Sequence, residues 1–260
     1  MQVFVKLLKD LPVHEIIFFR AFFAFIFCLF FMLKNKLKIF GTNKKLLFLR
    51  GFFGTLALFC FFSTIHHMPL ANASVIHYLS PLFTSFFSIF FLKEKLKPIQ
   101  WSFFILSFMG ISLIKGFDER VPLFYFILGV VSALFAGLAY NCIGKLKKSE
   151  HPLVIIFYFP LVTLPFITPY TIMNWVDPLP IQWLYLLGVG VCVQVAQYFM
   201  TLAYQEGKVS SLSLYNNLGP LFAVFFGLII FTESLLIIQI FGIALVLLGV
   251  YLNTKEEGKK

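Results

Sequence analysis

Nine long apolar segments divide the chain, and no other feature constrains its fold as strongly. The segments run over Val13–Leu33, Leu46–Ile65, Ala71–Leu92, Ile99–Ile114, Pro122–Ile143, Pro152–Met173, Ile181–Ala203, Val209–Phe231 and Leu235–Asn253. A helix of about 20 apolar residues spans the hydrocarbon core of a bilayer. Strands of a membrane barrel would alternate apolar and polar residues over about ten positions, which these segments do not. We therefore predict an all-α integral membrane protein with nine full transmembrane helices.

The composition agrees with a lipid environment and bears on the partners. The chain is 60% hydrophobic and 12% charged, whereas a soluble domain is about 45–50% apolar and about 25% charged. The net charge of +10 raises nucleic acid as a partner. A nucleic-acid binder gathers its charge on one folded face, but these lysines stand in short runs between apolar segments. We expect the lipid bilayer as a partner, and no nucleic acid.

The residues that carry metal, cofactor or catalytic chemistry show no such pattern. The four cysteines, Cys28, Cys60, Cys142 and Cys192, lie inside apolar segments without metal-ligand spacing, so we interpret them as reduced core residues. No sequence of the type G-x-x-x-x-G-K-[ST] is present to bind a nucleotide. No His, Asp and Glu set stands at depth in a segment, as an intramembrane enzyme would need. The sequence predicts no metal, no cofactor and no enzyme.

Basic residues gather in alternate loops. One set of loops holds 16 of the 21 basic residues, in runs that begin at Lys34, Lys93, Lys145 and Lys255 and together with Arg50 and Lys208. The other set of loops holds 4, and Arg20 lies within an apolar segment. Cytoplasmic loops carry the excess of Lys and Arg. We therefore predict a multi-pass protein of the cytoplasmic (inner) membrane, with its C-terminus in the cytoplasm.

An internal repeat relates the two halves of the chain. Leu79–Leu113 aligns without gaps on Leu218–Leu252 at an offset of 139, with 13 of 35 positions identical, among them Pro81/Pro220 and Gly110/Gly249. The repeated unit has five helices, and an odd number inverts the second copy in the membrane. Residues 93–97 contain three lysines, and the matching residues 232–236 contain none. This difference is expected if the two segments lie on opposite sides of the membrane. We predict two inverted five-helix repeats.

The register also sets the boundaries of the two units. The first repeat occupies residues 1–121, the second residues 122–254, and residues 255–260 form a cytoplasmic tail. The counterpart of the first helix of the second unit would begin before residue 1, so that only the stub Met1–Lys9 represents it. We expect a first repeat that lacks most of its first helix, either because the true start lies upstream or because the chain is truncated.

The ordered motifs resemble the EamA-type transporters of the drug/metabolite transporter superfamily. The resemblance rests on Pro12-x-x-Glu15-x-x-x-x-Arg20, Met68-Pro69-Leu70-Ala71-x-Ala73, Ser80-Pro81-Leu82-Phe83-Thr84, Leu92-Lys93-Glu94, Gln100 with Gly110, Gly219-Pro220-Leu221-Phe222, Thr232-Glu233 and Gln239 with Gly242 and Gly249. It covers nearly the whole chain. It implies ten helices in two inverted units and a carrier of small metabolites, and it leaves the substrate open. The missing first helix departs from that pattern.

Polar residues on three helix faces predict a central cavity. A polar side chain in lipid is costly unless it faces water or the protein interior. The predicted cavity residues are His77, Tyr78, Pro81, Gln194, Gln197, Tyr198, Asn216, Asn217 and Pro220. Each proline lies near mid-membrane and would kink its helix and release the carbonyl four residues earlier.

Each of these residues also has a purely structural interpretation. The prolines can serve helix packing alone, His77 can be a neutral, hydrogen-bonded core residue, and the two asparagines can bond between helices. Arg20 can anchor an anionic group or extend outward to the interface. We add Tyr140 and Asn141 as candidate gate residues.

Together these features favour a secondary transporter that moves a small, amino-acid-like or nucleoside-like amphiphile by alternating access. The chain offers no Asp or Glu at mid-membrane, so any proton dependence would run through His77. The alternatives are a truncated, transport-inactive remnant and a structural or channel-like membrane protein. The oligomeric state stays open, with a homodimer as one possibility.

Overall fold

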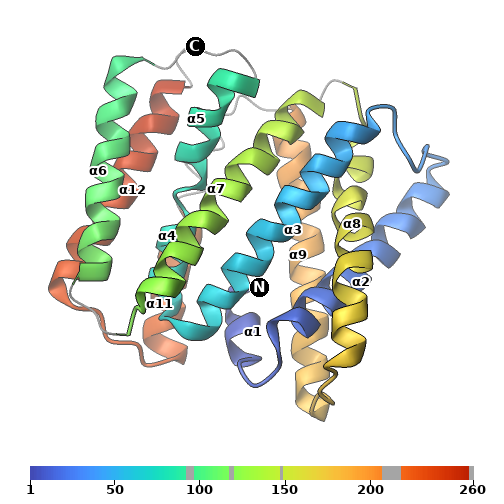
Figure 1. Cartoon of the computed structure of the whole chain (residues 1–260), viewed down its shortest axis with the longest axis horizontal. Helices are drawn as coiled ribbons and strands as arrows, with labels where there is room; N and C mark the ends of the chain where they lie inside the picture. The colour runs from blue at the N-terminus through green and yellow to red at the C-terminus, as the bar shows by residue number, and fades with distance from the viewer. Residues whose placement is uncertain (92–96, 117–119, 147–148, 207–217, 258–260) are drawn as a thin grey trace.

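The computed structural model describes residues 1–91, 97–116, 120–146, 149–206 and 218–257. The regular secondary structure of these residues is helical. The helices are α1 (Gln2–Leu7), α2 (Val13–Lys34), α3 (Lys44–His67), α4 (Leu70–His77), α5 (Ser80–Phe91), α6 (Pro98–Gly116), α7 (Leu123–Leu146), α8 (Pro152–Met173), α9 (Pro180–Glu206), α11 (Leu218–Ile230) and α12 (Ile237–Glu257). Figure 1 shows α6 and α12 beside each other at one end of the molecule, and α2, α3, α8 and α9 gathered at the other.

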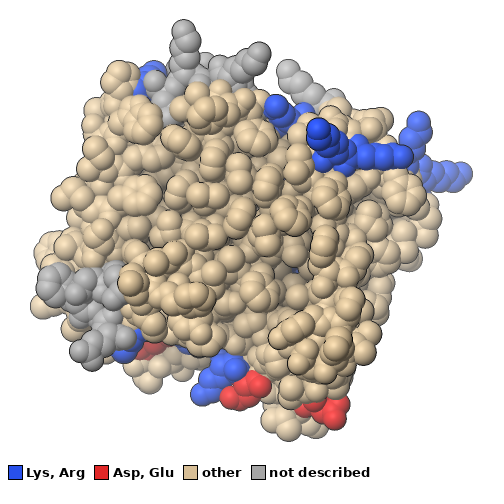
Figure 2. Space-filling model, viewed as in Figure 1, with Lys and Arg blue, Asp and Glu red and all other residues tan. Residues whose placement is uncertain are grey.

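Seven of these elements are long and apolar enough to cross a membrane, namely α2, α3, the α4–α5 pair, α7, α8, α9 and α12. The shorter apolar helices Pro98–Ile114 and Gly219–Ile230 occupy the remaining two predicted segments. The segment predicted from Val209 is described only from Leu218 onward. In Figure 2, charged side chains lie at the upper and lower rims of the face shown, with a broad uncharged band between them. The chain is thus a multi-pass membrane protein.

The α6–α12 seam, formed by Gly110, Gly242, Gly249 and the polar pair Gln100 and Asn253, brings two backbones into close contact. A Cβ added to Gly110 would stand 2.6 Å from the carbonyl oxygen of Gly242, and one added to Gly249 would stand 2.8 Å from that of Phe103. Small residues allow membrane helices to approach in this way. The repeated pair Gly110/Gly249 therefore has a packing reason, and the two helices run in opposite directions (Figure 1).

The repeated glutamines of the same register cap these two helices. The Gln100 Oε1 atom accepts the Lys97 backbone N–H at 2.8 Å, and Gln239 Oε1 accepts that of Leu236 at 2.9 Å. A Gln three residues into a helix satisfies an otherwise unpaired N–H in this way. The amide of Gln100 also donates to Asn253 Oδ1 at 3.1 Å, which links α6 to α12 within the seam.

The predicted kink before Pro81 is present as a break between two helices. Helix α4 ends at His77, and α5 begins at Ser80. A proline cannot donate the hydrogen bond that would continue the helix, and its ring clashes with the preceding turn. The break places the end of α4 against α7, where the polar contacts of His77 are made.

Candidate functional site

Two arginines meet inside the membrane-spanning bundle. Arg20 on α2 and Arg50 on α3 are each 6% exposed. Their Cζ atoms lie 4.5 Å and 5.5 Å from the centroid of the same ring, that of Phe159 on α8. The two guanidinium carbons are therefore at most 10 Å apart. We call Arg20, Arg50, Phe159 and the neighbouring Tyr140 the arginine centre.

Local sequence directs Arg50 toward the middle of the membrane. Its Nη1 atom lies 3.2 Å from the position that a Cβ on Gly54 would occupy, so the side chain runs along α3 by one turn. That turn corresponds to about 6 Å at 1.5 Å per residue. Because Gly54 has no side chain, the guanidinium fits between α3 and the Phe159 ring, which also lies 3.1 Å from that position.

The hydrogen-bonding capacity of the arginine centre is only partly used. The Nε and Nη1 atoms of Arg20 and the Nε atom of Arg50 are buried without a hydrogen-bond partner among the described residues. The ion pairs among the described residues, Lys6–Glu233 and Lys97–Glu256, include neither arginine. Burying an unpaired charge costs several kcal/mol. Such a cost is typical of intramembrane charges that serve a function.

The sequence identified one of these two arginines. Arg20 faces the protein interior on the Phe159 ring, and the alternative of an outward extension to the interface is wrong. The interpretation of Arg50 as one of the cytoplasmic loop charges is also wrong, because Arg50 is buried within α3. The small residues Gly51 and Gly54 that follow Arg50 were the available signal of a buried side chain.

The predicted polar face of α9 contacts α2 through Gln194. The amide nitrogen Nε2 of Gln194 donates to Cys28 Sγ at 3.1 Å, and Gln194 is 4% exposed. The Oε1 atoms of Gln194 and Gln197 are buried without a partner among the described residues. Tyr198, like Tyr140, packs against the buried cluster of α2, α7 and α8 side chains. The α9 amides therefore have unused acceptor atoms in the interior of the described bundle.

The predicted residues of α4 form a second polar contact with α7. His77 Nδ1 lies 2.9 Å from Ser132 Oγ, and the imidazole stacks on Phe61 with ring centroids 4.1 Å apart. Ser132 donates its hydroxyl to the Ala57 carbonyl at 2.7 Å, so His77 Nδ1 donates to Ser132. Tyr78 is buried beside it. Ala57 lies three residues after Gly54, so this contact is about one turn along α3 from the Arg50 guanidinium.

The remaining predicted residues occupy other positions. Asn141 donates from Nδ2 to the Thr84 carbonyl at 2.9 Å, which joins α7 to α5. Pro81 is half-buried at the start of α5, and Pro220 is buried in α11. Asn216 and Asn217 lie outside the described residues.

Comparison with known proteins decides the family. The sequence matches the EamA-like transporter family over residues 2–116 and again over residues 123–255. The chain belongs to the EamA-like transporter family. The two matched segments correspond to the two halves related by the internal repeat, so the duplication is shown. As a family member, the chain is a membrane transporter and not an enzyme.

Several curated relatives of this EamA-family transporter carry names that describe transport. The pseudopaline exporter CntI of Pseudomonas aeruginosa (strain UCBPP-PA14) is 29% identical over 225 residues, covering 86% of this chain and 79% of that protein. The S-adenosylmethionine uptake transporter of Rickettsia conorii is 26% identical, covering 84% and 75%. A solved crystal structure superposes with a TM-score of 0.66 at 17% identity over 96% of this chain and 93% of that one, which establishes the fold alone.

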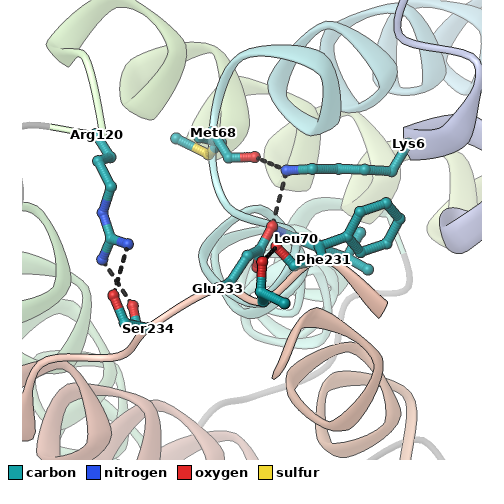
Figure 3. A network of polar contacts seen from close by, with 8 residues as sticks. Lys6, Met68, Leu70, Arg120, Phe231, Glu233 and Ser234 are labelled. Atoms are coloured by element: carbon teal, nitrogen blue, oxygen red, sulfur yellow. Dashed lines mark hydrogen bonds and ion pairs between the residues drawn. The ribbon is translucent and has the colours of Figure 1, made fainter. Parts of the chain in front are cut away.

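At one end of this EamA-family transporter, an ion pair joins three separate segments (Figure 3). We call Lys6, Met68, Leu70 and Glu233 the Lys6–Glu233 network. The Lys6 ammonium lies 2.9 Å from Glu233 Oε1 and donates to the Met68 carbonyl at 2.6 Å. Glu233 Oε1 also accepts the Leu70 N–H at 2.9 Å, at the first residue of α4. The network therefore connects α1, the start of α4 and the α11–α12 loop.

A second contact joins the α11–α12 loop to the segment before α7. Arg120, just before α7, donates from its Nη1 and Nη2 atoms to the hydroxyl and the carbonyl of Ser234 at 3.1 Å and 2.7 Å. Thr232, just before Glu233, adopts a φ of 49°. This left-handed conformation is uncommon outside glycine. The α11–α12 loop lies at the end of the bundle opposite to the C-terminus (Figure 1).

Two apolar grooves of the EamA-family transporter lie on its exterior. One has a volume of about 770 Å³ between α5 and α6 and includes Trp101 and Ile105 in its wall. The other has a volume of about 640 Å³ between α2 and α8 and includes Phe25 and Leu161. Neither contains a residue of the arginine centre. Within the described part of the chain, no three His, Cys, Asp or Glu residues are grouped to hold a metal ion.

Proposed function

We propose that this chain is a secondary transporter that moves a small metabolite across the cytoplasmic membrane by alternating access. The observation that carries the proposal is the arginine centre, a polar, incompletely bonded region enclosed by α2, α3, α7 and α8 in a membrane-spanning chain. A site between two repeated units is where such carriers hold their substrates. The substrate class that we propose is an amino-acid-like or nucleoside-like amphiphile.

The proposal includes two inverted units, residues 1–121 and 122–254. The opposite directions of α6 and α12 (Figure 1) support it, because these helices correspond to each other at the offset of 139. The contact between α6 and α12 would then lie on the pseudo-twofold axis. A carrier of this design rocks one bundle against the other around a fixed site.

We propose that the Lys6–Glu233 network closes the outer side. The network lies at the end of the bundle opposite to the C-terminus and the basic α2–α3 loop (Figures 1 and 2). By the distribution of basic residues, the C-terminal end faces the cytoplasm. Opening toward the outside would separate α1 and α4 from the α11–α12 loop and break the ion pair.

The proposal keeps as cavity residues the predicted set of His77, Tyr78, Pro81, Gln194, Gln197, Tyr198, Asn216, Asn217 and Pro220. It keeps Tyr140 and Asn141 as gate residues. The residues with the strongest support are Gln194 and Gln197, because their buried oxygens have no partner among the described residues.

Counterflow in proteoliposomes tests the proposal. Vesicles that contain the full chain are loaded with one unlabelled amino acid or nucleoside, and entry of the labelled compound is measured. A carrier gives saturable uptake that the internal compound accelerates. Uptake without acceleration would identify a channel, and no uptake above protein-free vesicles across the panel would identify an inactive remnant; either result contradicts the proposal.

Proton coupling through His77 has its own test. We predict that the pH dependence of uptake in proteoliposomes is flattened by His77→Gln, because Gln retains a donor for Ser132 but does not titrate. The control is Ser132→Ala, which removes the hydrogen-bond partner and keeps the imidazole. Identical pH profiles for the wild type and His77→Gln would remove His77 from the mechanism.

A further inference from the structure

We infer that the arginine centre binds an oxyanion of the transported molecule, so that the substrate carries a carboxylate or phosphate group. The inference rests on the proposed function and names the chemical class of its substrate. The sequence and the comparisons leave this class open, since the relatives named for transport differ in their cargo.

The charge balance of the bundle interior supports an anionic ligand. Arg20 and Arg50 bring two cationic groups within 10 Å of each other at the Phe159 ring. The ring interacts favourably with one guanidinium, but it carries no net charge. Like charges in a medium of low dielectric constant repel each other strongly. An anion between the two guanidinium groups would remove this repulsion.

The described carboxylates that could act as internal counterions are held elsewhere. Glu15 accepts the Val176 N–H, and Glu150 accepts from Thr42 and Asn43. The ion pairs found among the described residues are Lys6–Glu233 and Lys97–Glu256. No ion pair among the described residues joins an Asp or Glu to the arginine centre, and the inference assigns the neutralising negative charge to a ligand.

The geometry offers the anion directional donors. Three buried guanidinium nitrogens, Nε and Nη1 of Arg20 and Nε of Arg50, have no hydrogen-bond partner in the part of the chain that the structure describes. Guanidinium groups match planar oxyanions and bind them through paired N–H donors. Phe159 supplies an apolar wall on one side. A small molecule with an oxyanion at one end and a polar or apolar body would fit these neighbours.

Ligand-dependent thermal stabilisation of the purified full chain tests the inference. The unfolding temperature is measured in a neutral detergent from the fluorescence of the Trp residues, at constant ionic strength set with chloride. The probes are matched pairs: succinate against succinamide for a carboxylate, and O-phosphoserine against serine for a phosphate. A ligand that binds only the folded state raises the unfolding temperature according to its affinity.

The two arginines are compared with an exposed cation on α3, the helix of Arg50. The variants are Arg20→Gln and Arg50→Gln, with the charge-retaining Arg50→Lys, and the control is Lys45→Gln, an exposed lysine on α3. We expect at least one oxyanion to stabilise the wild type and Lys45→Gln, its neutral partner to have little effect, and the Gln variants to weaken binding at least about tenfold. Arg50→Lys should retain part of the response, which separates lost charge from lost folding.

The outcomes also distinguish this inference from the proposed function. A response to neither oxyanion, equal responses to the neutral partners, or unchanged responses in folded Gln variants would overturn the oxyanion site. Counterflow of neutral or cationic compounds alone would overturn the oxyanion site while the carrier function stands. Absence of counterflow for every compound would overturn the function itself.

Discussion

The α6–α12 seam and the arginine centre bury polar groups in two opposite ways. In the seam, neutral amides bond to one another: Gln100 donates to Asn253, and Asn253 donates to Ser85 at 2.6 Å. In the arginine centre, charged groups keep donors without partners. The seam also brings glycine backbones together, whereas the arginine centre surrounds long side chains with an aromatic ring.

The difference separates a region built for stability from one built for binding. A satisfied neutral network and close backbone packing fix two helices against each other. Unpaired buried charges make the folded state less stable, and a ligand of opposite charge can recover that free energy. We therefore expect changes in the seam to affect folding, and changes in the arginine centre to affect transport.

The largest expected effect concerns the arginine centre. We predict that Arg20→Met with Arg50→Met lowers the rate of counterflow at least about tenfold while the free energy of unfolding stays unchanged or rises by about 1–4 kcal/mol. The apolar side chains fill similar space without the cost of buried charge. Lys45→Met serves as the control on α3. A double variant that unfolds at lower denaturant concentration than the wild type would show that the arginines stabilise the fold.

The next effect concerns the seam. We predict that Gly110→Ala lowers the free energy of unfolding by about 1–3 kcal/mol, because its Cβ would stand 2.6 Å from the Gly242 carbonyl oxygen. The measurement is denaturant unfolding in micelles. Gly219→Ala is the matched control, since no atom lies within 4 Å of its Cβ position. Equal stability of the two variants would mean that α6 and α12 are not in close contact.

A smaller effect concerns the Lys6–Glu233 network. The two side chains are 18% and 10% exposed, so solvent screens part of their attraction. We predict a coupling energy of about 0.5–1 kcal/mol in a double-mutant cycle of Lys6→Met and Glu233→Gln, measured by thermal unfolding. The single variant Arg120→Gln should be additive with Lys6→Met, because Arg120 bonds to Ser234 instead. Additivity of Lys6→Met with Glu233→Gln would exclude the ion pair.

The smallest expected effect concerns the loss of stability at low pH through Glu150. Burial acts to raise the pKa of Glu150, in the turn before α8, but hydrogen bonds from Thr42 and Asn43 outweigh it and leave the pKa below its ordinary value. A lowered pKa in the folded state gives stability that is present above the unfolded pKa and is lost as the pH falls through the folded pKa. We predict that acidification below about pH 4.5 destabilises the wild type more than Glu150→Gln. Parallel pH profiles would contradict this.

The sequence predicted the parts of the fold that depend on periodicity and on the repeat. The apolar segments located the helices, and the offset of 139 singled out Gly110/Gly249 and Gln100/Gln239, which the structure explains by packing and capping. These features repeat locally along the chain. The break at Pro81 followed from the covalent structure of proline alone.

The arginine centre could be predicted only in part, because it depends on contacts between distant segments. Arg50 stands close to Lys44 and Lys45, the first two residues of α3, and a charge near the end of a helix ordinarily extends to the interface. Its inward direction depends on Gly54 and on Phe159 of α8, more than a hundred residues away in sequence. The pairing of Arg20 with Arg50 likewise requires the packing of α2, α3 and α8.

The central claim is that the arginine centre is a substrate site reached from each side of the membrane in turn. Cys28 is a natural reporter, since it is buried on α2, the helix of Arg20, and its Sγ accepts from Gln194. With Cys60, Cys142 and Cys192 changed to Ala, the rate at which a small, membrane-impermeant methanethiosulfonate labels Cys28 is measured in sealed vesicles of both orientations. The account predicts labelling from both sides, slowed by the oxyanion that stabilises the protein. Labelling from one side only, or none, would contradict it.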